Sequence, residues 1–394
     1  MPYTPSAFNR LLEPLNRRLV AAAVARHDGD RGVGQGENAW TCARHLKTLL
    51  FAQWTGLGSL RQIEVGLAGQ SAAFYHLGLR APCRSTLSDA GAQRPAAVFA
   101  EIAAGLAQKL AGTLGGEGGS LVRLLDSTPI MVKGERFAWA EKSARIRGLK
   151  LHLLYDPRAA RPVWFALSSA KVDDVVAGRA APLQPGATLV FDKGYTDYRW
   201  WAEIIAAGAR FITRRKRNGH ARPLGERPAE GAAILADRTI QVGHRRPKAG
   251  APANPLYRTT LREVVVERDG GGAPLVLLTN DLDRPAAQIA RLYKERWQIE
   301  LFFKWLKQNL KIRRFLGRSE NAVRTQVYAA LIAFMLPRLL HATTARAFRA
   351  GTALLLAQIK IDLFRPLHLC HPGRPKPPPP NTPPPPRQYP LAFR

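Results

Sequence analysis

Two aspartates close short apolar runs, a position from which carboxylates can do chemistry. Asp126 ends the run SLVRLLD (120–126), and Asp192 ends the run ATLVFD (187–192). Each run predicts a buried strand, so both side chains should emerge where a strand of the sheet ends. Two adjacent acids are unfavourable unless a cation bridges them, and carboxylate oxygens suit Mg²⁺. Taken singly, either residue is more typical of an ordinary strand-end or turn aspartate.

A third acid lies in the segment LYKERWQIELFFKWLKQNL (292–310), which we predict to be part of one long helix over 284–310. Polar side chains at offsets of 0, 3, 7, 11 and 14 in this segment fall within roughly 80° of one another on a helix. They are Tyr293, Arg296, Glu300, Lys304 and Lys307. The glutamate could supply a metal ligand while its neighbours grip phosphates. The alternative is the solvated face of an amphipathic helix.

The helix carries a spacing that matches a known signature. Y-x2-R-x3-E-x6-K is met without a gap by Tyr293, Arg296, Glu300 and Lys307. Together with the strings LLDSTPI (124–130) and FDKGYTDY (191–198), it resembles the DDE transposases of the insertion-sequence-4 family. The resemblance covers about residues 120–365.

The resemblance implies a fold and a catalytic triad. The fold is α/β, a ribonuclease H-like mixed sheet with flanking helices, interrupted by a β-rich insertion and preceded by a helical N-terminal domain. The triad, which binds metal and is catalytic, is matched by Asp126, Asp192 and Glu300. Its metal would be Mg²⁺, with Mn²⁺ as a possible substitute.

The resemblance also implies DNA contacts. The residues that match holders of the DNA-end phosphates are Tyr293, Arg296 and Lys307, and Lys304 fits the same stripe. Trp297 matches an aromatic that in some members packs near a displaced base, although a core tryptophan is an equal alternative. Lys193 is a further candidate phosphate contact.

The implied activity is that of a bacterial insertion-sequence transposase, which cuts DNA ends and joins them to new DNA. Its partners would be double-stranded DNA, both the terminal inverted repeats of the element and the target, and a second copy of the chain in a homodimeric synaptic complex. Two other readings stay open. One is a structure-specific nuclease on the same fold, which would cut without joining, and the other is an inactive or regulatory DNA-binding relative.

The changes of pattern along the chain predict its domain organisation. We expect a helical domain at 1–118, a catalytic domain at 119–217 and 283–365, a β-strand insertion at 218–282, and a disordered proline-rich tail at 366–394. Within the first of these, 59–94 is compatible with a DNA-end-binding helix-turn-helix, although many small helical bundles share its pattern.

Composition agrees with a polyanionic partner. The 394 residues carry a net charge of +30, of which +20 lies in the two catalytic segments. The three widely separated cysteines exclude a disulfide scaffold and argue against a zinc finger. The start of the chain lacks the pattern of a signal peptide, and the longest apolar stretch, 327–337, is too short to cross a bilayer. We therefore expect a cytoplasmic, nucleoid-associated protein without a membrane partner.

Overall fold

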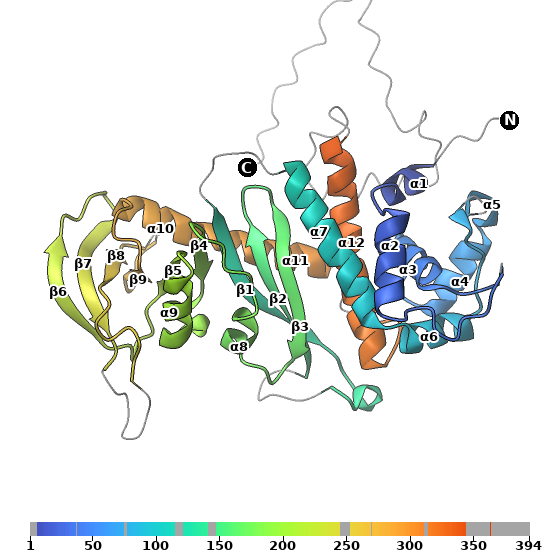
Figure 1. Cartoon of the computed structure of the whole chain (residues 1–394), viewed down its shortest axis with the longest axis horizontal. Coiled ribbons are helices and arrows are strands. Elements are labelled where there is room, and N and C mark those ends of the chain that lie inside the picture. Colours follow the sequence, from blue (N-terminus) through green and yellow to red (C-terminus); the bar gives the residue numbers. More distant parts are fainter. Residues whose placement is uncertain are drawn as a thin grey trace, which may run out of the picture.

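The computed structural model describes residues 6–36, 38–74, 77–114, 121–140, 147–244, 253–268, 270–310, 314–343 and 363. The tail predicted at 366–394 lies outside these residues. The described chain forms a long sheet flanked by helices, with the N-terminal helices beyond one end and the last strands at the other (Figure 1).

One mixed sheet of nine strands runs through the described part of the chain, in the order β3-β2-β1-β4-β5-β9-β8-β7-β6. β1 is parallel to β4, and β4 to β5, whereas β2 and β3 pair antiparallel beside β1. This is the arrangement of a ribonuclease H-like sheet, so the predicted fold class is confirmed. The strands are β1 (Val122–Met131), β2 (Gly148–Asp156), β3 (Arg161–Ser169), β4 (Thr188–Phe191), β5 (Arg210–Arg214), β6 (Ala221–Arg227), β7 (Ile234–Val242), β8 (Leu261–Val266) and β9 (Leu275–Thr279).

Strands β6 to β9 come from the segment predicted to be β-rich, and they extend the same sheet. β9 pairs antiparallel with β5, with Ile212 opposite Thr279. Because the hydrogen-bonded ladder is continuous, these strands share the sheet of the catalytic segments. The domain boundaries proposed from sequence therefore stay predictions, since one sheet runs across them.

Successive side chains of each strand point to opposite faces of the sheet, and both faces are apolar. Leu124 and Val190 belong to one core and the neighbouring Leu125 and Phe191 to the other. The first core includes α7 (Ala96–Leu114), α10 (Ala286–Glu295), α11 (Trp297–Asn309) and α12 (Glu320–Thr343). The second lies under α9 (Tyr198–Ala206) and the short α8 (Asp174–Gly178). The sheet is thus covered by helices on both faces.

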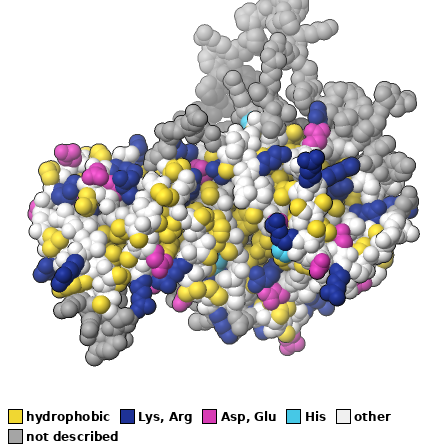
Figure 2. All heavy atoms as spheres, in the orientation of Figure 1, with side chains coloured by type: hydrophobic (Ala, Val, Ile, Leu, Met, Phe, Trp, Pro, Cys, Tyr) yellow, Lys and Arg dark blue, Asp and Glu magenta, His cyan; other side chains and the backbone are white. Residues whose placement is uncertain are grey.

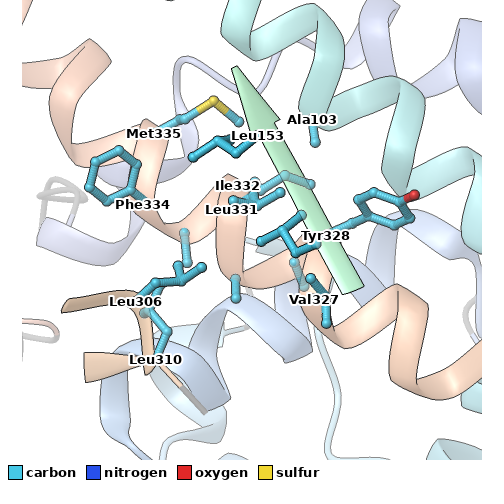
Figure 3. Packing of buried hydrophobic residues seen from close by; sticks show 14 of the residues in the cluster. Ala103, Leu153, Leu306, Leu310, Val327, Tyr328, Leu331, Ile332, Phe334 and Met335 are labelled. Carbon is cyan, nitrogen blue, oxygen red and sulfur yellow. The ribbon is translucent and has the colours of Figure 1, made fainter. Parts of the chain in front are cut away.

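Helix α12 is the centre of the larger core. Figure 3 shows its residues Leu331, Ile332 and Met335 packed against Leu153 of β2, with Leu306 of α11 close by. Residues 320–342 are long and apolar enough to span a bilayer, but 83% of their most apolar window is buried inside the protein. That burial is typical of a core helix, and no second helix in the described ranges passes the same test.

The N-terminal helices pack onto α12 rather than standing apart. They are α1 (Ala7–Leu12), α2 (Arg17–Arg26), α3 (Cys42–Thr55), α4 (Leu60–Ala68), α5 (Ser71–Phe74), α6 (Arg84–Gln93) and α7. The side-chain oxygen of Thr41 caps the start of α3, and Gly56, with φ of 77°, ends it. The buried indole of Trp54 on α3 donates to the carbonyl of Ala333 on α12, at 3.1 Å. Helices therefore occupy the segment predicted to be helical, and they share one core with the sheet.

A buried ion pair stabilises the far end of the sheet, and its loss should be costly. Arg262 donates to both carboxylate oxygens of Asp237, at 2.8 and 2.5 Å, and the two side chains are only 3% and 1% exposed. We expect Asp237→Ala to lower the free energy of unfolding by about 3–5 kcal/mol, because it leaves a buried guanidinium without its partner. Urea denaturation measures this loss.

The exposed pair between Arg238 and Glu226 on neighbouring strands is the matched control. Glu226 is 69% exposed in its side chain, so Glu226→Ala should change the free energy of unfolding by less than about 1 kcal/mol. Equal losses in the two variants would contradict the role given to the buried pair.

Candidate active site

The two predicted aspartates lie next to each other on adjacent parallel strands. The last paired residues of β1 and β4 are Leu125 and Phe191, so Asp126 and Asp192 follow side by side in the same register. Neighbouring strands are about 4.8 Å apart, which brings the two backbones together. The two acids therefore lie at adjacent positions on neighbouring strands of the sheet.

Asp126 lies within β1 and not at its end, contrary to the expectation from its apolar run. β1 continues to Met131, paired with β2. The pairing with β4 stops at Leu125, because β4 ends at Phe191. Asp126 is therefore the first residue of β1 with an open side toward β4, which leaves room for the carboxylate.

The long helix predicted over 284–310 is divided into α10 and α11, which meet at Arg296. The division places Arg296 between the acids. Its guanidinium lies 2.7 Å from Oε1 of Glu300 and 3.6 Å from Oδ2 of Asp126. The guanidinium also lies over the ring of Tyr293, which is buried, at 5.7 Å from the ring centroid. One arginine thus connects the helix acid to the strand acid.

The charges of the other two acids act on Asp126. Burial raises the pKa of Asp126 to about 6 from its ordinary 3.8, and the negative charges of Glu300 and Asp192 add to this rise. The backbone N–H of Ser127, which donates to Asp126 at 2.8 Å, and the charge of Arg296 oppose it. Asp126 therefore lies within the electrostatic reach of both other acids, and Arg296 pairs with Asp126 and Glu300.

A polar network supports Asp126 from the opposite face of β1. The hydroxyl of Ser127 donates to Asp174 of α8 at 2.8 Å, and Lys150 of β2 forms an ion pair with the same carboxylate at 3.2 Å. Burial, together with the negative charges of Asp126 and Asp174, raises the pKa of Tyr195, whose ring lies in this region. This network was missed from sequence, where the string VDDVV (172–176) was the only local signal.

The other predicted residues are distributed around this cluster. Lys307 donates to the hydroxyl of Thr128, two residues after Asp126, at 2.5 Å. Lys304 is exposed on α11. Trp297 is 57% exposed, so the alternative of a core tryptophan is wrong. Lys193 is exposed, and its backbone N–H donates to Asp192 at 2.6 Å.

The donor set suits a hard divalent cation, because all three acids supply carboxylate oxygens. As the side chains stand in the described residues, no group of three or more His, Cys, Asp and Glu side chains is placed to hold a metal ion. Arg296 lies between two of the three carboxylates and offsets part of their negative charge. A metal ion would therefore have to take over the charge that Arg296 now supplies.

The nine-stranded mixed sheet and its flanking helices place the chain in the class of α/β proteins with a ribonuclease H-like sheet, and the comparisons give the family. Residues 117–336 match the family described as "Transposase DDE domain". The chain belongs to this family, so it is a DNA transposase and DNA is its partner. The family implies cleavage and joining of DNA and the use of a divalent metal. Residues 4–80 match a second family, a domain of unknown function named DUF4372.

Named relatives agree with the family. The chain is 43% identical over 263 residues to "Putative transposase y4zB" of Sinorhizobium fredii, covering 66% of this chain and 71% of that protein. It is 29% identical over 226 residues to "Probable transposase for insertion sequence element IS5377" of Geobacillus stearothermophilus, covering 57% of each. The insertion-sequence resemblance is thereby confirmed. A solved structure, the piggyBac transposase synaptic complex with hairpin DNA, aligns with a TM-score of 0.48 and 8% identity over 93% of this chain and 82% of that one.

The raised pKa of Asp126 predicts a change of stability with pH. A buried carboxyl with a raised pKa destabilises the folded state when it is ionised, and this effect is absent below about pH 4 and complete above about pH 6. We expect Asp126→Asn to raise the free energy of unfolding above pH 6 by up to about 3 kcal/mol in chelator-containing buffer. Thermal or urea unfolding across pH 4–8 measures this gain. A variant that gains as much at pH 4 as at pH 8 would contradict the assignment.

Proposed function

We propose that the chain cleaves the ends of a bacterial insertion sequence and joins them to target DNA, with Asp126, Asp192 and Glu300 as the catalytic, metal-binding triad. The observation that carries the proposal is the convergence of these acids from β1, β4 and α11, with Arg296 paired to two of them.

The three carboxylates would hold divalent ions, Mg²⁺ or Mn²⁺. When bound, such ions stabilise charge on the attacking and leaving oxygens of an in-line phosphoryl transfer. The chain's own residues would orient the carboxylates: Ser127 fixes Asp126 through its backbone N–H, and the N–H of Lys193 does the same for Asp192. Arg296, once released from the acids, would be free to bind a DNA phosphate.

The reaction needs no covalent link between protein and DNA. A water oxygen attacks the phosphorus at the element end, the bond to the 3′ oxygen breaks, and that oxygen leaves as a 3′-OH. In the second step the 3′-OH attacks a phosphodiester, either of the opposite strand, which forms a hairpin, or of target DNA, and a new 3′ oxygen leaves. Lys304, Lys307 and Lys193 are proposed to hold the flanking phosphates, and exposed Trp297 to stack on an unpaired base.

The remaining proposals concern the assembly. Two copies of the chain would act together on the two terminal inverted repeats, and the helical segment 1–118, which contains α4 and α6, would bind the DNA ends. Binding to chromosomal DNA would place the protein at the nucleoid.

The triad is tested with a labelled duplex that carries an element end, in the presence of Mg²⁺. We expect the unaltered protein to give cleaved and strand-transfer products, and Asp126→Ala and Glu300→Ala to lower the rate on the order of 10³-fold while DNA binding remains. Glu203→Ala, which removes an exposed acid of α9 on the other face, is the matched control and should keep full activity.

Other outcomes would decide against the proposal. Cleavage without any joined product would indicate a structure-specific nuclease. Salt-sensitive DNA binding without products would indicate an inactive or regulatory relative. Full cleavage by either triad variant would refute the assignment of the acids.

The position of Arg296 predicts how Mg²⁺ affects stability. Arg296→Ala removes the cation between Asp126 and Glu300, so the metal-free variant should unfold at a lower temperature than the unaltered protein. Adding Mg²⁺ should then raise the unfolding temperature more in the variant than in the unaltered protein, because the ion replaces the lost charge. Arg291→Ala, an exposed position on α10, is the control. An equal or smaller Mg²⁺ effect in Arg296→Ala would contradict the prediction.

A further inference from the structure

Net charge alone does not mark a binding surface on this protein. Figure 2 shows Lys and Arg side chains dispersed across the face in view, with Asp and Glu side chains among them. A binding surface must therefore be found from shape combined with charge. A groove along the second half of β1 meets both criteria.

The groove has a volume of about 960 Å³ and is formed by three walls from separate parts of the chain, with Lys307 of α11 as a further lining residue. One wall is the start of α4, at Ser59 and Leu60, and another is the end of β1 with the segment that follows it, residues 129–134, 136 and 137. The third is the segment 314–318, which precedes α12. The N-terminal helices and the catalytic sheet thus meet at this groove.

The groove begins beside the acid cluster. Lys307 lines it and donates to Thr128, the residue before Pro129 of the groove wall. Thr128 is two residues along β1 from Asp126, a separation of about 7 Å in a strand. A chain bound in the groove would therefore lead directly to Asp126.

The lining is cationic. Its charged residues are Lys133, Arg136, Lys307, Arg314 and Arg318, and no acid is among the described residues that line it. All of these cations except Lys307 are exposed. No carboxylate in the described chain pairs with Arg136 or Arg318, so their charges are available to a polyanion.

Part of the groove lining is apolar. Met131 is 55% exposed, an unusual position for a large hydrophobic residue, and Phe315 and Leu316, which also line the groove, are partly exposed. A duplex presents phosphates and polar groove edges to a protein, whereas unpaired bases present flat apolar faces. Cations combined with an exposed methionine and phenylalanine therefore fit a single strand better than a duplex.

The segment 314–318 is held in place without a ligand. Gln326 of α12 donates to the carbonyl of Arg314 at 2.9 Å and accepts from the N–H of Leu316 at 2.9 Å. The indole of Trp139 donates to the carbonyl of Arg318 at 2.6 Å. Because both ends of the segment are fastened, the groove is preformed, and binding would not have to order this wall.

We propose that this groove binds a short stretch of unpaired DNA next to the phosphate that is cut. The proposal rests on the proposed function, since it makes the groove the approach to the same acids. It assigns Lys133, Arg136, Arg314 and Arg318 to the backbone of the single strand, and Met131 and Phe315 to its bases.

The test is a binding measurement that needs no catalysis. Fluorescence anisotropy in chelator-containing buffer compares a forked duplex, with a few unpaired nucleotides at its end, with a blunt duplex of the same sequence. The unaltered protein should bind the forked DNA more tightly. The double variant Arg136→Gln with Arg318→Gln should weaken binding of forked DNA about 10-fold and of blunt DNA less than about 3-fold.

A matched pair of exposed arginines outside the groove controls for charge. Arg222→Gln with Arg268→Gln removes the same charge from the far end of the sheet and should leave the preference for forked DNA unchanged. Met131→Ser, which keeps the charge and alters an exposed side chain, should lower binding of forked DNA several-fold and spare blunt DNA. A photoreactive base in the unpaired stretch should crosslink to residues 129–137.

The results separate this proposal from the proposed function. Equal weakening of forked and blunt DNA, or no weakening of either, in the double variant would overturn the single-strand groove, whatever the triad does. If the groove variants behave as expected while no strand-transfer product forms with Mg²⁺, the groove stands and the proposed catalytic function falls.

Discussion

The active region depends on one guanidinium. Arg296 lies at the junction of two helices and pairs with acids from a helix and from a strand, which would otherwise repel each other in a half-buried site. The ion pairs therefore fasten α11 to β1 as well as balancing charge. The junction between α10 and α11 is where the Arg296 side chain extends toward the sheet and reaches Asp126.

β1 has a different task on each of its faces. Asp126 and Thr128 point toward α11 and its lysine, while Ser127 between them points toward α8 and Asp174. The period of two that gives the sheet its two cores thus also separates the acid cluster from the polar network that supports it. A one-residue shift in the pairing of β1 would exchange these roles, so the register of this strand is as important as its residues.

Local patterns predicted much of this arrangement, but not the contacts between distant segments. The apolar runs before Asp126 and Asp192 predicted strands, and the spacing from Tyr293 to Lys307 predicted the helix face, because both signals lie within a few turns or a single strand. The helical spacing of polar and apolar residues continues through 284–310, so the sequence did not predict the division of this helix at Arg296. The extension of β1 beyond Asp126 was also missed, because its length is decided by its partner β2 and not by its own residues.

The ion pair between Arg296 and Asp126 and the network around Asp174 had no local signal, since each joins segments far apart in the sequence. The same holds for the joining of β9 to β5, which makes the β-rich segment part of the central sheet. Such features depend on which distant strand or side chain each one contacts in the folded chain. Composition and spacing do not predict these long-range contacts.

The packing of α3 on α12, where the indole of Trp54 donates to the carbonyl of Ala333, bears on the distance along DNA between a bound sequence and the cutting site. A helical region joined to a catalytic sheet by a linker can reach DNA at many distances from the cutting site. Here the N-terminal helices and the sheet share one hydrophobic core, so the packing sets the separation between the surface of those helices and Asp126. If those helices bind a DNA sequence, a fixed number of base pairs would separate that sequence from the phosphate that is cut. The packing of the hydrophobic core would set that number.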